Sequence, residues 1–394
     1  MEGARVILHV TDCFRPRLGG IEVQVEELAR AQQADGETVQ VVTATPAADG
    51  TDRPGCGYPV HRVVARLPWE LPVHPRAGRH LRGLFTDLRP EVVHVHLGSV
   101  SPFAWSAVRC ALRCRLPTVV TVHSMWNPAT CGMYRSFDRL AGWSGAPLVV
   151  TAVSTAAAEL VRSTAPDATA IVVPNGIAPD QWRTAGRPDD AADDAAGNGP
   201  VHVVAVGRLA PRKEPVTLLE VLDAARNRLD GEVPLRATVA GTGPALSMMQ
   251  RYLRRHAMAD VVRLVGRLDR GGVRTLLASA DLFVNPTVRE SFGIATLEAR
   301  TAGVPVLARA GNGVADFIHH GREGLLCHSV DDLVDAVVWL ARDRQARQRI
   351  RRHNRATVPT QCTWPAVLAA FRDCYGRATT LATRPAGRGG SESS

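Results

Sequence analysis

Short apolar stretches alternate with amphipathic segments along the first half of the chain. Val6–Val10 is mostly apolar, as in a strand buried on both faces, whereas Ile21–Ala34 places Val25, Leu28 and Ala29 on one side of a helix. The same pattern predicts further strands at Val39–Thr43, Tyr58–Val64, Val92–His96, Thr118–His123, Leu148–Ala152 and Ala170–Val173. It predicts further helices at Ala77–Leu88 and Phe103–Arg113, and one more between the last two strands. Repeated strand–helix units form a parallel sheet that is covered on both faces.

The alternation restarts in the second half. Strands are predicted at Val201–Val206, Leu235–Ala240, Val261–Leu264, Leu282–Asn285 and Val304–Ala308. Helices are predicted at Pro215–Asn227, Ala245–His256 and Val273–Ser279, after Glu290, and from Asp331. The fold class is therefore α/β, with two Rossmann-like, doubly wound parallel-sheet domains.

A change in composition separates the two halves. Arg187–Pro200 reads RPDDAADDAAGNGP and has no apolar periodicity, so it is interpreted as an exposed linker rather than an acidic metal site. We expect an N-terminal domain at 1–186, the linker at 187–200, a second domain at 201–360, a C-terminal helix at 361–382 and a disordered tail at 383–394. Open α/β sheets bind ligands beyond the carboxyl ends of their strands, so the active site is expected in the cleft between the domains.

Composition narrows the function classes. The 394 residues carry a formal net charge of +9, which favours anionic partners, although Arg-rich coding would produce the same excess. No basic block is interleaved with aromatic residues, so nucleic acid is not an expected partner. The eight cysteines form no CxxC pair and are interpreted as reduced thiols. With no signal peptide and no run of about 18 apolar residues, we expect a cytoplasmic protein, and peripheral contact with an anionic membrane stays open.

The stretch from Glu290 to Glu298 joins a strand to a helix. Ser291 is expected to cap the helix and Gly293 to leave bare backbone in its first turn. Glu298 lies on a mostly apolar helix face, where an unpaired carboxylate would be costly. Either a basic or backbone partner, or a ligand with adjacent hydroxyls, would satisfy it.

A cationic loop follows the first strand of the second half. Gly207 opens space there, and Arg208 and Lys213 can converge on one anion, with the planar fork of Arg and the point charge of Lys suited to a diphosphate. Gly241 and the Gly266-Arg267 pair close two further strands. Solvated surface charge and plain turns are the alternative interpretation.

The first half carries a glycine loop and a histidine at the end of a strand. Gly19 and Gly20 precede the first helix and let a phosphate or sugar approach its N-terminus, and a tight turn would use them equally well. The loop is not the GxGxxG fingerprint of a dehydrogenase. His123 closes its strand, where it can hydrogen-bond a sugar hydroxyl or serve as a structural histidine. His94 and His96 share one face of another strand and can reach the same region.

Taken in order, these segments resemble the retaining glycosyltransferases of family 4. The strongest motif is Glu290-Ser-Phe-Gly-Ile-Ala-Thr-Leu-Glu298, in which seven residues separate two glutamates. The supporting motifs are Gly19-Gly20-Ile21-Glu22, His123, Val173-Pro174-Asn175-Gly176-Ile177, Gly207-Arg208-Leu209 with Lys213, and Gly303-Val304-Pro305-Val306. The resemblance covers nearly the whole chain and implies the GT-B fold, with the C-terminal helix after Trp364-Pro365 crossing back to the first domain.

The resemblance also implies roles for individual residues. The catalytic set is His123 beside the anomeric carbon, Arg208 and Lys213 on the diphosphate, and Glu290 on the hydroxyls of the transferred sugar. Glu298 is expected to hold ribose hydroxyls. The donor-binding set comprises Gly19, Gly20, Gly207, Gly241, Gly266, Arg267, Ser291, Phe292, Gly293, Ile294 and Glu298. The acceptor-binding set comprises Arg15, Arg17, His96 and Asn127.

The chemistry implied is transfer of a sugar of the GlcNAc, mannose or glucose type from an NDP-sugar, UDP- or GDP-linked, to a hydroxyl acceptor, with retention and with no cofactor. No metal-binding DxD motif lies in a cleft position, so no metal is expected. The chain departs from the family pattern at Glu214, Ala178 and Val314-Ala315, where Gly, Asp and Pro-Glu are common. The start Asp12–Glu22 resembles relatives that glycosylate phosphoinositides or cyclitols with GlcNAc or mannose.

Several alternatives remain open at this point. The acceptor can be a phosphoinositide, another lipid, a cyclitol or an aminocyclitol of an antibiotic pathway. A nucleotide-sugar hydrolase or epimerase, or a catalytically silent binding protein, would share much of the pattern. The basic residues Arg76, Arg79, His80 and Arg82 on a predicted helix are either a contact for anionic lipid or solvated surface.

Overall fold

The computed structural model describes residues 6–17, 19–47, 57–65, 74–183 and 199–383. Within it the chain forms two compact units. The first unit comprises Met1–Gly176 together with Trp364–Ser394, and the second comprises Ile177–Thr363. Most of the predicted linker and nearly all of the predicted tail lie outside the described residues.

The first unit is built on a seven-stranded sheet with the order β3-β2-β1-β4-β5-β6-β7. All of its strand pairings are parallel. The strands are β1 (Val6–Thr11), β2 (Thr38–Thr43), β3 (Val60–Arg62), β4 (Val92–Leu97), β5 (Thr118–Val122), β6 (Val149–Ala152) and β7 (Ala170–Val172). The strand order reverses between β1 and β4, which is where doubly wound sheets bind ligands.

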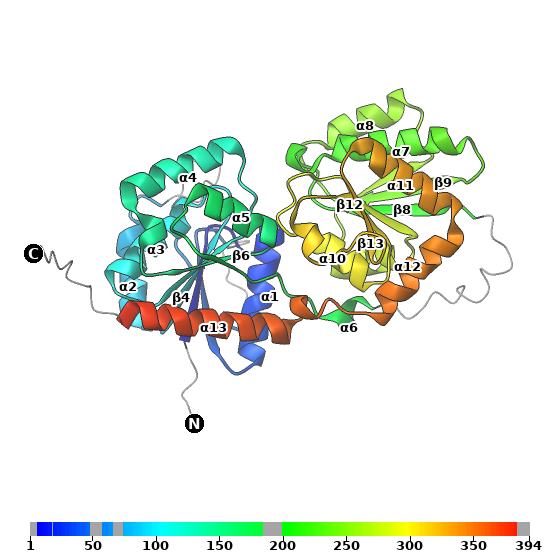
Figure 1. The fold of residues 1–394 in the computed structure, drawn as a ribbon. Helices are drawn as coiled ribbons and strands as arrows, with labels where there is room; N and C mark the ends of the chain where they lie inside the picture. Colours follow the sequence, from blue (N-terminus) through cyan, green and yellow to red (C-terminus); the bar gives the residue numbers. More distant parts are fainter. Residues whose placement is uncertain (1–5, 18, 48–56, 66–73, 184–198, 384–394) are drawn as a thin grey trace, which may run out of the picture. The chain divides into compact units, whose positions relative to one another are not determined.

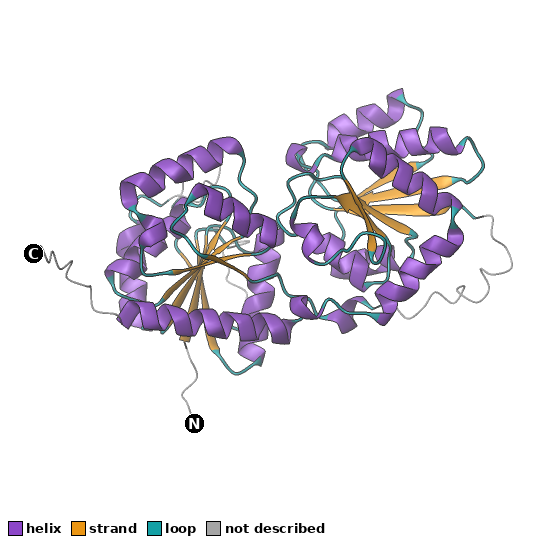
Figure 2. Ribbon diagram, in the orientation of Figure 1, coloured by secondary structure: helices purple, strands orange, loops and turns teal. Residues whose placement is uncertain are grey.

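Helices cover both faces of this sheet (Figures 1 and 2). They are α1 (Gly20–Ala34), α2 (Ala77–Leu88), α3 (Pro102–Arg113), α4 (Pro128–Ala141), the 3₁₀ turn η3 (Trp143–Gly145), α5 (Thr155–Thr164) and α13 (Trp364–Thr383). Helix α13, the last described element of the chain, packs with α1 against Ile7, Val92 and Val119. Helices α2, α3 and α5 pack on the opposite face.

The second unit repeats this architecture with six parallel strands in the order β10-β9-β8-β11-β12-β13. The strands are β8 (Val201–Val206), β9 (Leu235–Ala240), β10 (Val262–Gly266), β11 (Leu282–Asn285), β12 (Val306–Arg309) and β13 (Gly324–Cys327). The α-helices are α6 (Pro179–Trp182), α7 (Pro215–Leu229), α8 (Leu246–Arg255), α9 (Arg270–Ala278), α10 (Ile294–Thr301), α11 (Val330–Arg342) and α12 (Arg344–Ala356). The 3₁₀ turns are η5 (Pro211–Lys213), η6 (Gly313–Asp316) and η7 (Thr360–Cys362). The order reverses between β8 and β11.

The structure confirms the predicted fold class of two parallel-sheet α/β domains. Helix α2 has the predicted bounds, and most strands agree within two residues. The sequence pattern did not predict α4, α12 or β13. Ser291 does not cap the helix as expected: α10 begins at Ile294, and its N-cap is Gly293.

One face of the first sheet carries polar side chains toward the carboxyl ends of its strands. Ile7, Val92 and Val119 pack in the apolar layer under α13, whereas His9, His94 and Thr121 stand two residues further along the same strand faces. All three polar side chains are buried. Alternation with period two therefore produces a buried polar row inside an otherwise apolar interior.

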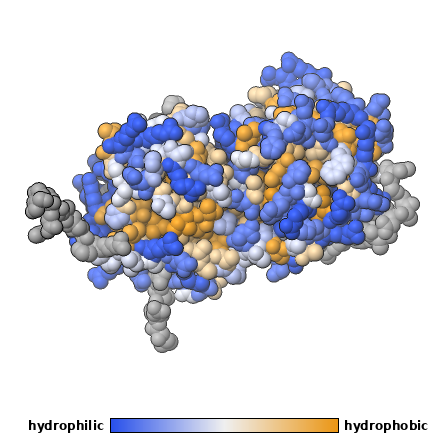
Figure 3. All heavy atoms as spheres, viewed as in Figure 1, coloured by the Kyte–Doolittle hydropathy of each residue, from blue (hydrophilic) through white to orange (hydrophobic). Residues whose placement is uncertain are grey.

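On the face that the space-filling view of Figure 3 draws, much of the surface of each unit is polar. In Figure 3, α8 and α12 present mainly hydrophilic side chains, and apolar side chains gather beside α13 on the face shown. Within the described part of the chain, no helix is long and apolar enough to cross a membrane. The seven cysteines in that part are all free thiols.

Candidate active site

An ion pair joins the two loops that flank the reversal point of the second sheet. Lys213 ends η5 in the loop after β8, and Glu290 lies in the loop after β11. Lys213 Nζ is 2.5 Å from Glu290 Oε2, and the side chains are 24% and 8% exposed. Asn285 Nδ2 donates a longer hydrogen bond to the same oxygen, at 3.4 Å. A nearly buried carboxylate thus has the cationic partner that burial requires.

Backbone contacts hold these loops in place. Thr287 Oγ1 donates to the carbonyl oxygen of Lys213 (3.2 Å), and Gly313 N donates to that of Glu290 (2.9 Å). Asn312, which caps η6, donates to the carbonyl of Thr287 (3.0 Å). The ion pair therefore rests on a hydrogen-bonded framework that includes three loops.

Gly293 shapes the start of α10. Its φ of 90° lies in a region that side chains rarely adopt, and an added Cβ would lie 2.9 Å from Val314 Cγ2. Phe292 is buried against Phe317, with ring centroids 5.1 Å apart. The first N–H groups of a helix have no intrahelical acceptor, so this turn offers donors to a ligand beside Glu290.

Three glycines form a strip of bare backbone at the ends of β8, β9 and β10. Gly207 N donates to Ala240 O (3.0 Å), and Gly241 N donates to Gly266 O (2.7 Å). A Cβ on Gly241 would lie only 1.8 Å from Gly207 O. A side chain is therefore excluded at Gly241, whereas the space beside Gly207 and Gly266 is open to a ligand.

The remaining predicted residues of the second unit lie at its surface or edge. Arg208 and Arg267 are exposed, and among the described residues neither guanidinium has a hydrogen-bond or ion-pair partner. Glu298 and Ser291 are half-buried. The structure thus brings Lys213 and Glu290 together and leaves Arg208 directed to solvent.

In the first unit, His123 follows β5 and is largely buried. Its backbone N–H donates to Leu97 O (2.9 Å), and its Nε2 lies 3.0 Å from His96 Nδ1. Burial lowers the pKa of His123 to about 4, so the ring is neutral near pH 7. The second ring nitrogen of His96 bonds His9, which places His96 behind His123.

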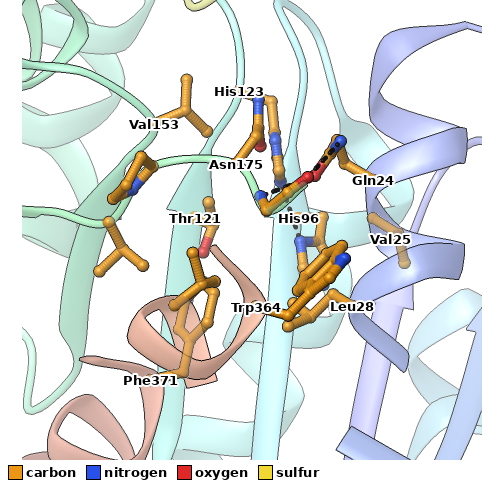
Figure 4. Close-up of a pocket in the computed structure, with 14 residues that line it drawn as sticks. Gln24, Val25, Leu28, His96, Thr121, His123, Val153, Asn175, Trp364 and Phe371 are labelled. Carbon is orange, nitrogen blue, oxygen red and sulfur yellow. Dashed lines mark hydrogen bonds between the residues drawn. The ribbon is translucent and has the colours of Figure 1, made fainter. Parts of the chain in front are cut away.

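His123 also lines a small pocket with residues from α1, α13 and the segment after β7 (Figure 4). Gln24 brackets the backbone of Gly176: its Oε1 accepts from Gly176 N (3.1 Å) and its Nε2 donates to Gly176 O (3.3 Å). A Cβ on Gly176 would lie 2.4 Å from the Trp364 ring. Asn175 lines the same pocket and is buried.

The glycine loop of the first unit is flanked by ion pairs. Gly19 is the N-cap of α1, and an added Cβ would lie 2.5 Å from Glu22 Oε2; Gly20 is the exposed first residue of the helix. Arg15 pairs with Glu26. Arg17 lies 3.9 Å from Glu22.

Asn127 has a structural role in the same unit. It is the N-cap of α4, and its side-chain oxygen accepts from Thr130 N (2.8 Å). Capping with this geometry satisfies one of the unpaired N–H groups at a helix start.

Comparison with known families decides the class. The model for glycosyl transferases group 1 matches residues 187–357, and the model for Glycosyltransferase Family 4 matches residues 18–181. The chain is a family 4 glycosyltransferase. It is therefore an enzyme, of a family of retaining hexosyltransferases.

Relatives of this glycosyltransferase span its length. It is 28% identical over 392 residues to a GDP-mannose-dependent alpha-(1-6)-phosphatidylinositol monomannoside mannosyltransferase of Mycobacterium tuberculosis, covering 94% of this chain and 97% of the relative. It is 27% identical to a D-inositol 3-phosphate glycosyltransferase of Pseudarthrobacter chlorophenolicus, covering 87% and 88%. The structure of Anabaena HepE in complex with UDP and glucose superposes with a TM-score of 0.74 at 18% identity, covering 96% and 99%. That likeness shows the GT-B fold.

Sequence reasoning missed several residues of this glycosyltransferase that hold His123 in place. His9, Gln32 and Tyr375 form hydrogen bonds behind it, and Gln24 and Trp364 line its pocket. A usable signal existed, because His9 interrupts an apolar strand two residues before Thr11, as His94 does before His96. Gln32 and Tyr375 lie on helices and carry no comparable local signal.

Proposed function

We propose that this glycosyltransferase moves a hexose from a UDP- or GDP-linked donor to a hydroxyl of a cyclitol-containing acceptor, with retention. The observation that carries the proposal is the Lys213–Glu290 pair at the reversal point of the second sheet, beside the glycine strip. Ligands of doubly wound sheets bind at this position. A cation, a carboxylate and bare backbone are together suited to a diphosphate linked to a hydroxyl-rich sugar.

Lys213 is proposed to stabilise the leaving diphosphate. An ammonium has three N–H donors, so Lys213 can keep its bond to Glu290 and still donate to phosphate oxygens. Arg208, from the same loop, adds a second cation. Cleavage of the anomeric C–O bond moves negative charge onto the diphosphate, and fixed cations stabilise that charge in the transition state.

Glu290 is proposed to hold hydroxyls of the transferred sugar, together with the backbone N–H groups of Phe292, Gly293 and Ile294. A carboxylate accepts from two adjacent hydroxyls, and the N–H groups donate to their oxygens. Glu298, half-buried on α10, is proposed to hold ribose hydroxyls. Gly207, Gly241, Gly266, Arg267 and Ser291 complete the proposed donor site.

From the first unit, His123 is proposed to contact the sugar beside the reacting carbon, and Gly19 and Gly20 to approach donor phosphates. The acceptor hydroxyl attacks the anomeric carbon on the face from which the diphosphate departs. Its proton passes to a leaving phosphate oxygen, so charge and atoms balance without a carboxylate nucleophile. Arg15, Arg17, His96 and Asn127 remain the proposed acceptor-side residues.

The acceptor class is supported by the relatives. Those named above act on a phosphatidylinositol mannoside and on D-inositol 3-phosphate, and both acceptors contain a cyclitol ring. A phosphatidyl-myo-inositol mannosyltransferase of Mycobacterium leprae is a third such relative, at 28% identity. The ion pairs of Arg15 and Arg17 place two cations beside the glycine loop, where an acceptor phosphate can compete for them.

A donor and acceptor screen tests the proposal. UDP or GDP release is measured for hexose and N-acetylhexosamine donors, with inositol, inositol phosphate, an aminocyclitol or phosphatidylinositol vesicles, and products are identified by mass spectrometry. Acceptor-dependent release with an α-linked product supports transfer. Release that does not depend on acceptor indicates a hydrolase, and interconverted donor indicates an epimerase.

Peripheral membrane contact is proposed through α2. Arg76, Arg79, His80 and Arg82 are exposed on or beside this helix, while its residue Leu81 packs inward. Solvated surface charge would give the same exposure. Co-sedimentation with phosphatidylinositol vesicles at low salt separates the two: binding that falls when the three arginines become serine supports contact, and absence of binding excludes it.

A further inference from the structure

The buried polar row of the first sheet forms one continuous hydrogen-bonded chain. His123 Nε2 lies 3.0 Å from His96 Nδ1, and His96 Nε2 lies 2.9 Å from His9 Nδ1. His9 Nε2 lies 2.7 Å from the side-chain oxygen of Gln32, on α1. Three hydrogen bonds thus connect the pocket to an amide deep in the unit. We call these residues, Gln32, His9, His96 and His123, the histidine chain.

A second branch leaves the same amide. Gln32 Nε2 donates to Tyr375 Oη (2.7 Å), which lies 2.9 Å from His94 Nδ1. His94 Nε2 bonds Thr121 Oγ1 (2.7 Å), and Thr121 bonds Thr151 (2.6 Å). Tyr375 is a residue of α13, so the last described helix fixes this branch. Both the oxygen and the nitrogen of the Gln32 amide therefore form hydrogen bonds.

The histidines of both branches are neutral near pH 7. Burial lowers the pKa of His9 to about 4, and burial together with neighbouring histidines places the pKa of His94 and of His96 well below 6.5. A neutral imidazole carries one N–H, so each ring donates through one nitrogen and accepts through the other. The histidine chain therefore has only two proton arrangements, one the reverse of the other.

The orientation of the Gln32 amide selects between them. Its oxygen faces His9 and can only accept, so the hydrogen of His9 is on Nε2. His9 Nδ1 must then accept from His96 Nε2–H, and His96 Nδ1 from His123 Nε2–H. His123 Nδ1 is left with a bare lone pair. Reversing the amide would put a hydrogen there instead.

We propose that Gln32 is a positioning residue: through His9 and His96 it fixes the tautomer of His123 in which Nδ1 accepts a hydrogen bond, selecting a substrate hydroxyl that donates at this point. The inference deepens the proposed function and rests on it for the identity of the hydroxyl. Among the described residues, His123 Nδ1 has no hydrogen-bond partner. Gln32 itself is 2% exposed and does not line the pocket of His123.

A metal site is the competing interpretation of the same cluster. Nitrogens of His9, His94 and His96 lie within 4.8 Å of one another, and the group contains no carboxylate. All six of these ring nitrogens already take part in hydrogen bonds within the two branches. A divalent cation would break several of them and bring its charge into an interior without a compensating anion.

The test reads the tautomer directly. Histidine ring ¹⁵N signals of the full-length protein are recorded at pH 7.5 by long-range ¹H–¹⁵N correlation, and His123 is assigned from the spectrum of His123→Asn. The inference requires Nε2–H with bare Nδ1 at His123 in the wild type. The opposite tautomer overturns it without any variant.

Gln32→Met tests whether the Gln32 amide sets the direction of the hydrogen bonds along the histidine chain, because Met has a similar length and lacks the amide. The N–H of His9 then has no acceptor, so we expect the Nδ1–H form of His123 to appear and kcat/KM for the acceptor to fall about threefold to tenfold. Tyr375→Phe breaks only the second branch and should keep the wild-type tautomer at His123. Gln33→Met, at the exposed neighbour, should change neither readout.

Three further outcomes contradict the inference. An unchanged His123 tautomer in folded Gln32→Met, an equal change in Tyr375→Phe, or Zn²⁺ binding by the wild type with shifted signals from His9, His94 and His96 each overturns it. If the wild type transfers no sugar to any acceptor, the proposed function fails, and the tautomer readout still decides the role of Gln32. Should Gln32→Met not fold, the wild-type spectrum alone decides.

Discussion

The two units place chemically different groups at equivalent positions. At the reversal point of the second sheet, loops hold a charged pair, Lys213 and Glu290, beside bare glycine backbone. In the first sheet the corresponding region holds neutral rings: His9 and His96 on the strands themselves, and His123 directly after β5. Side chains on loops can present their charges to a charged ligand, whereas side chains on strands are held in fixed directions, so hydrogen bonds between their neutral groups have fixed directions too. One fold thus supports an electrostatic site and an orientational one.

The largest expected effect is acid unfolding of the first unit. His9, His94, His96 and His123 have pKa values lowered by burial, so as the pH falls below 6.5 the unfolded state binds up to four more protons on them. Burial raises the pKa of Asp12 to about 7, against two N–H bonds from α3, so the folded state binds one more proton there. The net difference of about three protons lowers stability by about 4 kcal/mol per pH unit as pH falls.

A domain with about 6 kcal/mol of stability, near the lower end of the usual range of about 5–15 kcal/mol, would then unfold near pH 5. The second unit should stay folded at a lower pH than the first unit. Burial alone would raise the pKa of Glu323, but hydrogen bonds from His319 and His353, with Arg300 nearby, lower it to about 2. The stability that ionised Glu323 contributes is therefore fully present above about pH 4.5 and is lost only below that pH. Urea unfolding at pH 7, 6 and 5 should show the first transition shifting alone. A transition independent of pH over this range would contradict the neutral histidine chain.

Lys213→Ala should give the largest kinetic loss. Removal of a preorganised group that stabilises transition-state charge costs about 10²–10³ in rate. The measurement is kcat for nucleotide release with a saturating acceptor. Arg212→Ala, at the exposed preceding residue of η5, is the matched control and should retain activity. Equal losses of kcat in the two variants would contradict the proposed role of Lys213 at the diphosphate.

Gly293→Ala should destabilise the second unit by about 2–3 kcal/mol. Its φ of 90° strains any side chain, and the new Cβ would meet Val314 at 2.9 Å. Gly311→Ala, with φ of 72° and open space around it, isolates the backbone term and should cost about 1 kcal/mol. Chemical denaturation at pH 7.5 measures both. If Gly311→Ala lowers the free energy of unfolding as much as Gly293→Ala, the contact with Val314 adds nothing to the destabilisation.

Gly176→Ala should affect the first unit less, by about 1–2 kcal/mol. Its φ is ordinary, and the cost comes from a Cβ that would overlap the Trp364 ring at 2.4 Å. Gly132→Ala, within α4 and with nothing near the new Cβ, should instead stabilise the unit by about 0.5–1 kcal/mol. Changes in Tm of opposite sign for the two variants would confirm close packing of α13 on this segment, and changes of the same sign would refute it.

Much of the fold follows from local pattern, and the exceptions have physical reasons. Helix α12 offers few apolar residues, with Ala346 and Ile350 its buried ones, so its periodicity is hidden among arginines. Strand β13 has four residues and lies at the edge of the sheet, with β12 as its neighbouring strand. Ser291 has the composition of a cap, but the left-handed conformation of Gly293 moves the helix start two residues onward.

The candidate site divides in the same way. Motif spacing identified Lys213 and Glu290 separately, whereas their contact joins residues 77 positions apart and depends on the sheet order. Alternating polar positions indicated His94 and His96. The bond from Gln32 to Tyr375 spans 343 positions, and only folding of α13 onto the sheet brings these residues together.

The discontinuity of the first unit has a consequence for biosynthesis. Its sheet is complete by Val172, but α13, which seals one face and supplies Tyr375, is translated only after the whole second unit. The second unit is contiguous from Ile177 to Thr363 and can finish folding while the first still exposes an apolar sheet face to the ribosome exit. Domains usually fold in the order of synthesis; here the N-terminal unit is expected to mature after the second unit, and a truncation before Trp364 would leave the fold of the N-terminal unit incomplete.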